Sequence, residues 1–316
     1  MNRIFSMVKT QPIWIFVIAC FVFFSFASPY FFDIDNFTNI LVQASTIGLI
    51  ALGMTYVMIN GNIDLSVGAT LALAASLAVG LQDQVGISGA VCIGLLSGIL
   101  IGGLNGLIAW KTGVDAFIVT LGAMIGVRGL VFVYTDEQSF YAYDLAYSDF
   151  GASSLFGMPV LALIFILLTI LLHLVLKYSI HGRNVFAVGG NRDAAKEAGI
   201  RVGPHMLLNF ILVGFLAALA GILLSTQMGA STPNLGRNYE LWTITAVVLG
   251  GTRLTGGFGS IIGTLGGVLA IAILRNGMNM LQVPSFYVLI VLGTILITVL
   301  FLDKQFGEPQ GQGVKA

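Results

Sequence analysis

The chain has 316 residues, of which 57% are hydrophobic and only 9% are charged. Soluble domains carry about 25% charged residues, so this composition excludes a soluble globular protein. The formal net charge is zero, and no basic patch outside the expected loops indicates a nucleic-acid-binding protein.

Apolar runs recur along the whole chain. At about 20 residues per span, they predict an all-α, polytopic membrane protein with about ten transmembrane helices. We expect a single transmembrane domain over residues 1–316, with a cytoplasmic loop at 178–205. The expected spans are 12–32, 38–59, 65–81, 87–110, 114–134, 159–177, 206–229, 241–251, 260–281 and 286–302.

The first 27 residues resemble a signal peptide, because Arg3 and Lys9 precede an apolar run. The apolar stretch 13–32 is too long for a cleaved signal and further spans follow it, so we expect an uncleaved first span. Cys20 and Cys92 both lie inside apolar runs, which predicts free thiols and no disulfide framework.

Basic residues predict the orientation, because short cytoplasmic loops of membrane proteins are enriched in them. An even number of spans with cytoplasmic N- and C-termini places most of them inside: Arg3, Lys9, Lys111, Lys177, Arg183, Arg192, Lys196, Arg201, Arg253, Lys304 and Lys315. The outer segments hold one basic residue, Arg237, and many acidic ones: Asp33, Asp35, Asp83, Asp136, Glu137, Asp144, Asp149 and Glu240. We therefore expect a multi-pass protein of the cytoplasmic (inner) membrane.

The loop 60–68, Asn-Gly-Asn-Ile-Asp-Leu-Ser-Val-Gly, joins the second and third expected spans. Asp64 with Ser66 can cap the N-terminus of the third span, where a carboxylate complements the helix dipole. The alternative is a gate or contact at the inner face, with Asn60 and Asn62 lining a path. The glycine-rich loop 250–257, which contains Arg253, is a candidate counterpart in the second half. Residues 250–259 form either a broken helix or a re-entrant loop.

Small residues recur at every fourth position in several expected spans, which places them on one helix face and lets backbones approach closely. We expect a densely packed bundle. The four ridges are Gly94, Gly98, Gly102 and Gly106; Ala217, Gly221, Ser225 and Gly229; Gly259, Gly263 and Gly267; and Gly122 with Gly126.

Ionisable groups at membrane depth are functional candidates, and Arg128 and Arg275 lie inside expected spans. Arg275 with Asn276 and Asn279 can hydrogen-bond a polar solute that loses its water. Snorkelling of both arginines to the interface is the alternative. The candidates for a translocation path are therefore Asn105, Arg128, Arg275, Asn276 and Asn279. Apart from Asp115 at the very start of the fifth, no Asp or Glu falls inside an expected span, which argues against the proton relay of a secondary transporter.

Enzymatic signatures are absent from the sequence. No G-x-x-x-x-G-K-[ST] phosphate-binding loop and no H-E-x-x-H motif occur. His173, His181 and His205 are scattered along the chain, which argues against a metal site. We expect a protein that is not an enzyme and needs no cofactor.

Residues 177–205 form the one long polar segment of the chain. Within it, Asp193-Ala194-Ala195 and Gly199 indicate a short helical turn that a glycine closes. A chain this apolar has little reason to keep a soluble helix unless a soluble partner docks on it. The segment therefore predicts a membrane subunit driven by a cytosolic partner.

Three stretches resemble the signatures of ribose-type ABC transporter permeases, and the similarity covers nearly the whole chain. Residues 62–68 resemble the family's G-I-D-L-S-V-G run, and 187–200 resemble its G-G-N…A…G-I loop. The third and most specific stretch combines 239–241, 246–252 and 256–257. Two departures are visible, since Asn62 stands where glycine is usual and Ala69 where serine is common.

The resemblance implies a dimeric pore in which each subunit offers a coupling helix to a cytosolic ATPase, the partner that hydrolyses ATP. It assigns this ATPase-coupling role to Asp193, Ala194, Ala195, Glu197 and Gly199. A periplasmic or lipid-anchored binding protein would deliver a monosaccharide to the outer face. A bulky residue at Gly199 is then expected to uncouple transport without preventing membrane insertion.

Other readings stay open. A permease of the same type could carry a furanose autoinducer, a nucleoside or a branched-chain amino acid. An ion-coupled carrier would need buried carboxylates, and a membrane-embedded enzyme would need a nucleophile, base or metal cluster. The sequence leaves open which sugar is carried and whether the pore is a homodimer or pairs with a sister permease.

Overall fold

The computed structural model describes residues 13–306. Its elements in chain order are α2 (Ile13–Ala27), α3 (Ile34–Ile59), α4 (Val67–Gly80), α5 (Gln82–Thr112), α6 (Ala116–Thr135), β1 (Phe140–Tyr141), α7 (Leu145–Ala152), β2 (Ser154–Leu155), β3 (Met158–Pro159), α8 (Val160–Tyr178), α9 (Ile180–Gly190), α10 (Arg192–Glu197), α11 (Val202–Met228), β4 (Ala230–Ser231), α12 (Tyr239–Leu249), α13 (Ile261–Met280) and α14 (Ser285–Phe306). The strands form two short antiparallel pairs, β1 with β4 and β2 with β3. The all-α prediction is confirmed.

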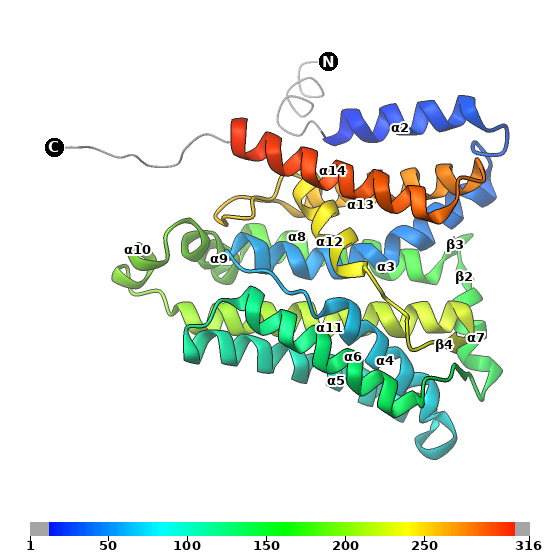
Figure 1. Ribbon diagram of the computed structural model, residues 1–316, viewed down its shortest axis with the longest axis horizontal. Helices are drawn as coiled ribbons and strands as arrows, with labels where there is room; N and C mark the ends of the chain where they lie inside the picture. Colours follow the sequence, from blue (N-terminus) through cyan, green and yellow to red (C-terminus); the bar gives the residue numbers. More distant parts are fainter. Residues whose placement is uncertain (1–12, 307–316) are drawn as a thin grey trace.

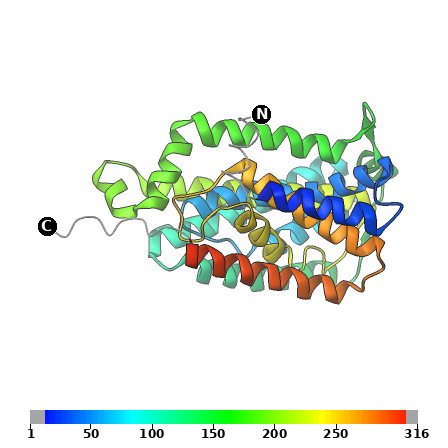
Figure 2. The same ribbon diagram turned by 90° about the horizontal axis from the view of Figure 1, so that it is seen from above.

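The long helices run along one common direction (Figures 1 and 2). α9 and α10 protrude at one end of this bundle, which we call the α10 end. α7 and the short strands lie at the opposite end, which we call the α7 end.

The polytopic prediction is confirmed. Within the described residues, six helices are long and apolar enough to cross a membrane, namely α3, α5, α6, α8, α11 and α13. Shorter apolar helices, α2, α4, α12 and Ser285–Thr298 of α14, account for the remaining predicted segments. The count of ten complete crossings stays a prediction. Several residues used for the orientation and the first span lie outside the part whose side chains are described: Arg3, Lys9, Pro12, Lys304 and Lys315.

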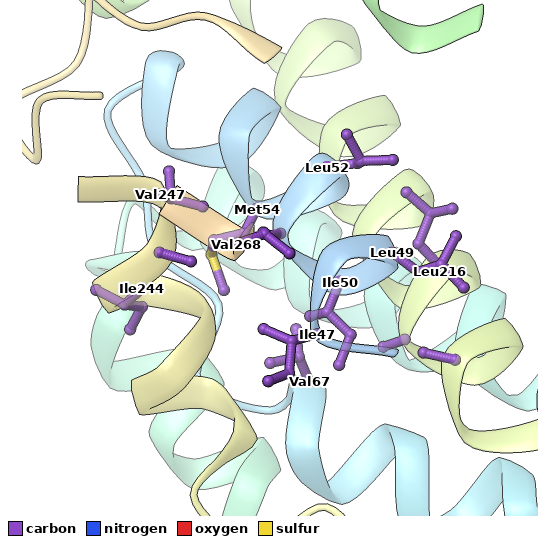
Figure 3. Close-up of a cluster of buried hydrophobic side chains, with 14 of the residues drawn as sticks. Ile47, Leu49, Ile50, Leu52, Met54, Val67, Leu216, Ile244, Val247 and Val268 are labelled. Carbon is purple, nitrogen blue, oxygen red and sulfur yellow. The ribbon is translucent and has the colours of Figure 1, made fainter. Parts of the chain in front are cut away.

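α3 is the central helix of the bundle. In its most apolar window 89% of the residues are buried, against 22% for α5 and for α6. Figure 3 shows its side chains packed against those of four other helices: Ile47, Leu49, Ile50, Leu52 and Met54 of α3 with Val67, Leu216, Ile244, Val247 and Val268. α5 and α6 therefore expose apolar faces to lipid or to a partner, while α3 holds the bundle together.

The small-residue ridges account for the close packing of the helices. A β-carbon at Gly98 would overlap the carbonyl oxygen of Gly214, and one at Gly221 would overlap that of Leu71. Gly267 meets the carbonyl of Ala246 in the same way. These approaches confirm the expected dense packing for three ridges. The fourth ridge differs, because β-carbons at Gly122 and Gly126 would meet no atom of this chain within 4 Å.

α4 and α12 are too short to cross a bilayer. They have 14 and 11 residues, which at about 1.5 Å per residue is about 21 and 16 Å, less than the roughly 30 Å of a hydrocarbon core. The segments expected as the third and eighth spans are thus short helices, each preceded by a non-helical segment. Segment 60–66 leads into α4, and segment 232–238, a run of turns, leads into α12 (Figure 1).

The two non-helical segments enter the bundle from opposite ends. Segment 60–66 starts at the α10 end, where α3 terminates, and 232–238 starts at the α7 end, directly after β4. Segment 250–259 instead connects α12 to α13 at the α10 end, where Gly257 N donates to Ile59 O over 2.8 Å. The loops 60–68 and 250–257 thus meet at the α10 end, and their expected relation as counterparts in the two halves stays a prediction.

Candidate functional site

α4 and α12 begin beside each other near the middle of the bundle (Figure 1), and we call this place the helix crossing, residues 66–68 and 236–240. A β-carbon at Gly236 would lie 2.7 Å from the carbonyl oxygen of Gly68, and one at Gly68 would overlap the carbonyl of Gly236. Gly236 also has a φ of +70°, which favours glycine. Both glycines are required for the two backbones to meet.

Asp64, Ser66 and Asn105 form a buried network at the start of α4. One Asp64 carboxylate oxygen accepts from Ser66 N at 2.8 Å and from Ser66 Oγ at 2.6 Å. Ser66 Oγ also accepts from Asn105 Nδ2 at 2.9 Å. Asp64 is only 1% exposed. Asp64 and Ser66 were candidates for an inner gate and Asn105 for the path, but all three lie inside the protein and hold the start of α4.

Arg128 of α6 supports the other half of the helix crossing. Its Nη1 donates to the carbonyl oxygens of Pro233 at 3.0 Å and Leu235 at 2.8 Å. These carbonyls belong to the run of turns 232–238, where neither a β-ladder nor a helix supplies a donor to them, so the guanidinium provides the missing donors. Arg128 therefore lies inside the bundle and positions α12, and the snorkelling interpretation is wrong for it.

Glu240 lies in the first turn of α12 and is half-buried. The carboxylate reaches the backbone of Gly68, and its charge attracts Arg128. A carboxylate in the first turn complements the helix dipole. The expectation that Glu240 belongs to an outer loop is wrong, because it lies in the first turn of α12. Hydropathy missed it because the apolar run starts one residue later.

Arg275 of α13 packs against the start of α12. Its guanidinium carbon lies 4.0 Å from the centroid of the Trp242 ring, a cation–π contact. Arg275 also hydrogen-bonds the Tyr239 hydroxyl. Its expected neighbours do not join it. Asn276 Nδ2 donates to Asn36 Oδ1 at 2.8 Å inside the bundle, and Asn279 is exposed near the end of α13.

α10 is a separate, exposed helix held by specific caps. Asn191 Oδ1 accepts from Asp193 N at 3.1 Å and from Ala194 N at 3.0 Å, which pairs two donors of the first turn. Gly199, with a φ of +83°, ends the turn, and nothing lies within 4 Å of a β-carbon there. The sequence prediction of a short helix closed by glycine is confirmed.

Only one residue of α10 points into the protein. Ala195 is 4% exposed and packs with Val188, Ile200 and Val202. Asp193, Ala194 and Glu197, three of the proposed coupling residues, are exposed on the opposite side. A helix that buries one small side chain and exposes the rest is available for docking.

A polar cavity of about 190 Å³ lies beneath α10. It is lined by residues of four segments: Asn60, Gly61, Asn62, Val188, Gly189, Gly190, Asn191, Arg192, Val202, Met206 and Thr255. The buried Asn60 Nδ2 has no hydrogen-bond partner, while Asn62 Nδ2 donates to Asn60 O at 3.1 Å. The gate candidates are thus divided. Asn60 and Asn62 line this cavity, whereas Arg253 stacks on Phe258 within its own loop.

The structure brings two of the three histidines together, contrary to the expectation that they are scattered. The rings of His181 in α9 and His205 in α11 have centroids 5.0 Å apart. Along residues 13–306 no group of three His, Cys, Asp or Glu side chains forms a possible metal site. Sequence reasoning missed this pair because it depends on how α9 packs against α11.

Comparison with known proteins identifies relatives over most of the chain. The family described as "Branched-chain amino acid transport system / permease component" matches residues 36–300. A ribose import permease protein of Bacillus subtilis is 40% identical over 89% of this chain and 88% of its own length. No solved structure matches.

Two further relatives are permeases of Escherichia coli. The D-allose transport system permease protein is 35% identical over 94% of this chain and 91% of its own length. The L-arabinose transport system permease protein is 33% identical over 91% of this chain and 87% of its own length. The apolar helices and these relatives agree on a multi-pass inner-membrane protein without enzymatic activity of its own. The chain belongs to this family of transport-system permeases.

Proposed function

We propose that this chain is the membrane-spanning subunit of an ATP-binding-cassette importer that carries a monosaccharide. The relatives named for ribose, allose and arabinose support the sugar. The observation that carries the mechanism is α10, an exposed, capped helix at one end of an apolar bundle. A separate cytosolic ATPase would supply the energy and a separate binding protein the sugar.

The distribution of charges supports an orientation with the α10 end in the cytoplasm. Basic residues gather at the ends of helices and in the loops on that side: Lys111, Lys177, Arg183, Arg192, Lys196, Arg201 and Arg253. Acidic residues gather at the α7 end: Asp33, Asp35, Asp83, Asp136, Glu137, Asp144 and Asp149. This asymmetry follows the rule for short cytoplasmic loops.

We propose that Asp193, Ala194, Ala195, Glu197 and Gly199 receive the ATPase. A push on α10 would reach the end of α3 through α9, because a β-carbon at Gly189 would overlap Ile59 O. Ile59 O also accepts from Gly257 N. The carbonyl of Ile59 therefore contacts both α9 and the loop before α13. A displacement of α3 at this point would pass along segment 60–66 to the helix crossing.

The solute path is proposed to run beside the first turn of α12. Tyr239, Glu240, Trp242 and Arg275 are all half-buried there, and they combine an aromatic face with hydrogen-bonding groups, the chemistry that a sugar needs when it leaves water. Arg128 supports the same turn from α6. A second copy of this chain, or a sister permease, would close the path, since α5 and α6 expose apolar faces and the open glycines Gly122 and Gly126.

The test is uptake of labelled solutes by cells that carry or lack this gene, together with its ATPase and binding protein. The panel contains ribose, allose, arabinose, galactose and leucine. Saturable uptake of one sugar, abolished by deletion of the gene, is the expected result. Leucine is the second candidate because the family's description names branched-chain amino acids; uptake of leucine without any sugar would replace the sugar assignment.

A further inference from the structure

Four polar side chains form a continuous hydrogen-bond chain between α9, α11 and α3. His181 Nδ1 lies 2.8 Å from His205 Nδ1, and His181 Nε2 lies 2.9 Å from Asn209 Oδ1. Asn184 Nδ2 lies 2.9 Å from His205 Nε2. Asn209 Nδ2 continues the chain to the carbonyl oxygen of Tyr56 at 3.4 Å. Every ring nitrogen of both histidines is used.

The contacts determine the proton on each ring. Asn184 Nδ2 can only donate, so His205 Nε2 is an acceptor and the proton of the neutral ring is on Nδ1. His205 Nδ1–H therefore donates to His181 Nδ1. His181 Nε2–H in turn donates to Asn209 Oδ1, which can only accept. Every hydrogen bond of this chain of side chains therefore points from Asn184 toward Tyr56 O. This arrangement requires both imidazoles to be neutral.

The chain connects the docking segment to the centre of the bundle. Asn184 and His181 belong to α9, the helix that leads into α10, whereas Asn209 is 1% exposed inside α11. The Tyr56 ring of α3 stacks on His181 with centroids 6.2 Å apart and an interplanar angle of 15°. Tyr56 is itself tied to α8, because its hydroxyl donates to Leu172 O at 2.6 Å.

We propose that His181 and His205 are positioning residues for transport: their neutral pair clamps α9 to α11 and α3, and protonation of the pair opens the clamp. This inference rests on the proposed role of α10 as the ATPase-docking helix. A first added proton requires Asn184 to rotate its amide so that its oxygen accepts. A second removes the His–His bond altogether, because two imidazolium rings have only donors to offer each other.

The surroundings of the pair favour the neutral form. Two titratable groups face His181: the imidazole of His205 in α11 and the phenol of Tyr56 in α3. On α8 the charged group is Lys177, and its charge acts on His173. The carboxylates of α10 are exposed, and none of those described adjoins the pair. Burial lowers the pKa of His181 below its ordinary value; the bond to Asn209 opposes this, and a charge on His205 adds to it.

The clamp opens at low pH. A histidine released from the clamp binds a proton at its ordinary pKa of about 6.5, more readily than the clamped one. The clamp is therefore intact at neutral and alkaline pH on the α10 side and is progressively lost as the pH falls below about 6.5. Loss of one ordinary hydrogen bond lowers the equilibrium constant for closing the clamp by about fivefold.

The test uses the complete transporter in proteoliposomes, with the ATPase side held at pH values from 8 to 5.5. The measured quantity is sugar moved per ATP hydrolysed, which removes the pH dependence of the ATPase itself. We expect this ratio to fall by about fivefold or more in the native protein. The His181→Gln/His205→Gln variant, which cannot titrate, should show a low and pH-independent ratio, because one glutamine cannot replace both ring nitrogens.

His173→Gln is the matched control, since His173 of α8 lies outside the hydrogen-bond chain. This variant should keep the native fall in sugar moved per ATP at low pH. A double variant that keeps the native fall, or a native ratio that is constant down to pH 5.5, overturns the proposal.

A second measurement needs no transport. Spin labels on Glu197→Cys of α10 and Leu208→Cys of α11, both at exposed positions, report the separation of the two helices in a protein without Cys20 and Cys92. The distance distribution should broaden at pH 5.5 in the native background but already be broad at pH 8 in the double variant. Broadening, together with an absence of ATP-driven sugar uptake by the unlabelled native transporter, would support the clamp while refuting the proposed function. A distribution unaffected by pH would refute the clamp alone.

Discussion

Gly236 at the helix crossing provides a sharp test of the packing. Substitution Gly236→Ala places a side chain at a φ of +70°, which costs about 1–2 kcal/mol for an L-residue. The new β-carbon would also lie 2.7 Å from Gly68 O and 2.8 Å from Leu71 Cδ2. Because one of these atoms belongs to the backbone of α4, α4 and α12 must separate, and such overpacking costs about another 1–3 kcal/mol.

The chain offers a matched control for this substitution. Gly113, after α5, has a φ of +72° but nothing within 4 Å of a β-carbon. Gly113→Ala should therefore cost only the conformational part, about 1–2 kcal/mol. Comparing the two variants separates the cost of the contact between α4 and α12 from the conformational cost of the left-handed backbone.

The assay is the midpoint of thermal unfolding of the purified protein in detergent, followed by size-exclusion chromatography after heating. At roughly 2 °C per kcal/mol for a chain of this size, Gly236→Ala should lower the midpoint by about 4–10 °C and Gly113→Ala by about 2–4 °C. Equal shifts for the two variants would refute the close approach of α4 and α12.

Three further predictions concern the coupling helix and the crossing. Asn191→Ala removes the cap of α10 and should destabilise this helix by about 1 kcal/mol, so that ATPase binding to the permease, measured by pull-down, weakens while membrane insertion is normal. Gly199→Phe should abolish ATP-driven uptake with normal insertion, because the new side chain projects from the docking surface; native uptake would contradict the role of α10. Arg128→Lys should reduce uptake more than Asn279→Ala, since one ammonium replaces the guanidinium Nη1 that bonds both Pro233 O and Leu235 O; equal uptake by the two variants would exclude a positioning role for Arg128.

The helical segments could be predicted from the sequence because hydropathy depends on local composition. All ten apolar segments appear as helices, and α10 with its closing glycine was expected from residues 193–199 alone. Local signals were sufficient there, since a glycine that ends a helix acts within the last turn of that helix. The cap by Asn191 was not part of that prediction.

The depth of the short helices could not be predicted in the same way. The residues of α4 and α12 are apolar like those of complete spans, and hydropathy does not show whether a short apolar helix crosses the membrane or begins inside the bundle after a non-helical segment. The lead 232–238 contains Pro233, Asn234 and Gly236, which argue against regular helix, but its entry into the bundle depends on Arg128, 105 residues away from Pro233.

Long-range pairs explain the remaining differences. Asp64 was expected near the inner face, but its partner Ser66 is held by Asn105, 39 residues along the chain. His181 and His205 are separated by 24 residues, and only the turn at α10 brings them together. Asn276 was expected in a path with Arg275, yet adjacent residues of a helix face different neighbours, and its partner is Asn36.

The source of energy distinguishes an ATP-driven importer from an ion-coupled carrier. Sugar uptake by cells that express the complete transporter would be measured after ATP is depleted and, separately, after the ion gradient is collapsed with ATP preserved. Uptake should stop when ATP is removed and persist when only the gradient is lost. Uptake that follows the ion gradient and ignores ATP would make this chain a secondary carrier and would remove the role assigned to α10.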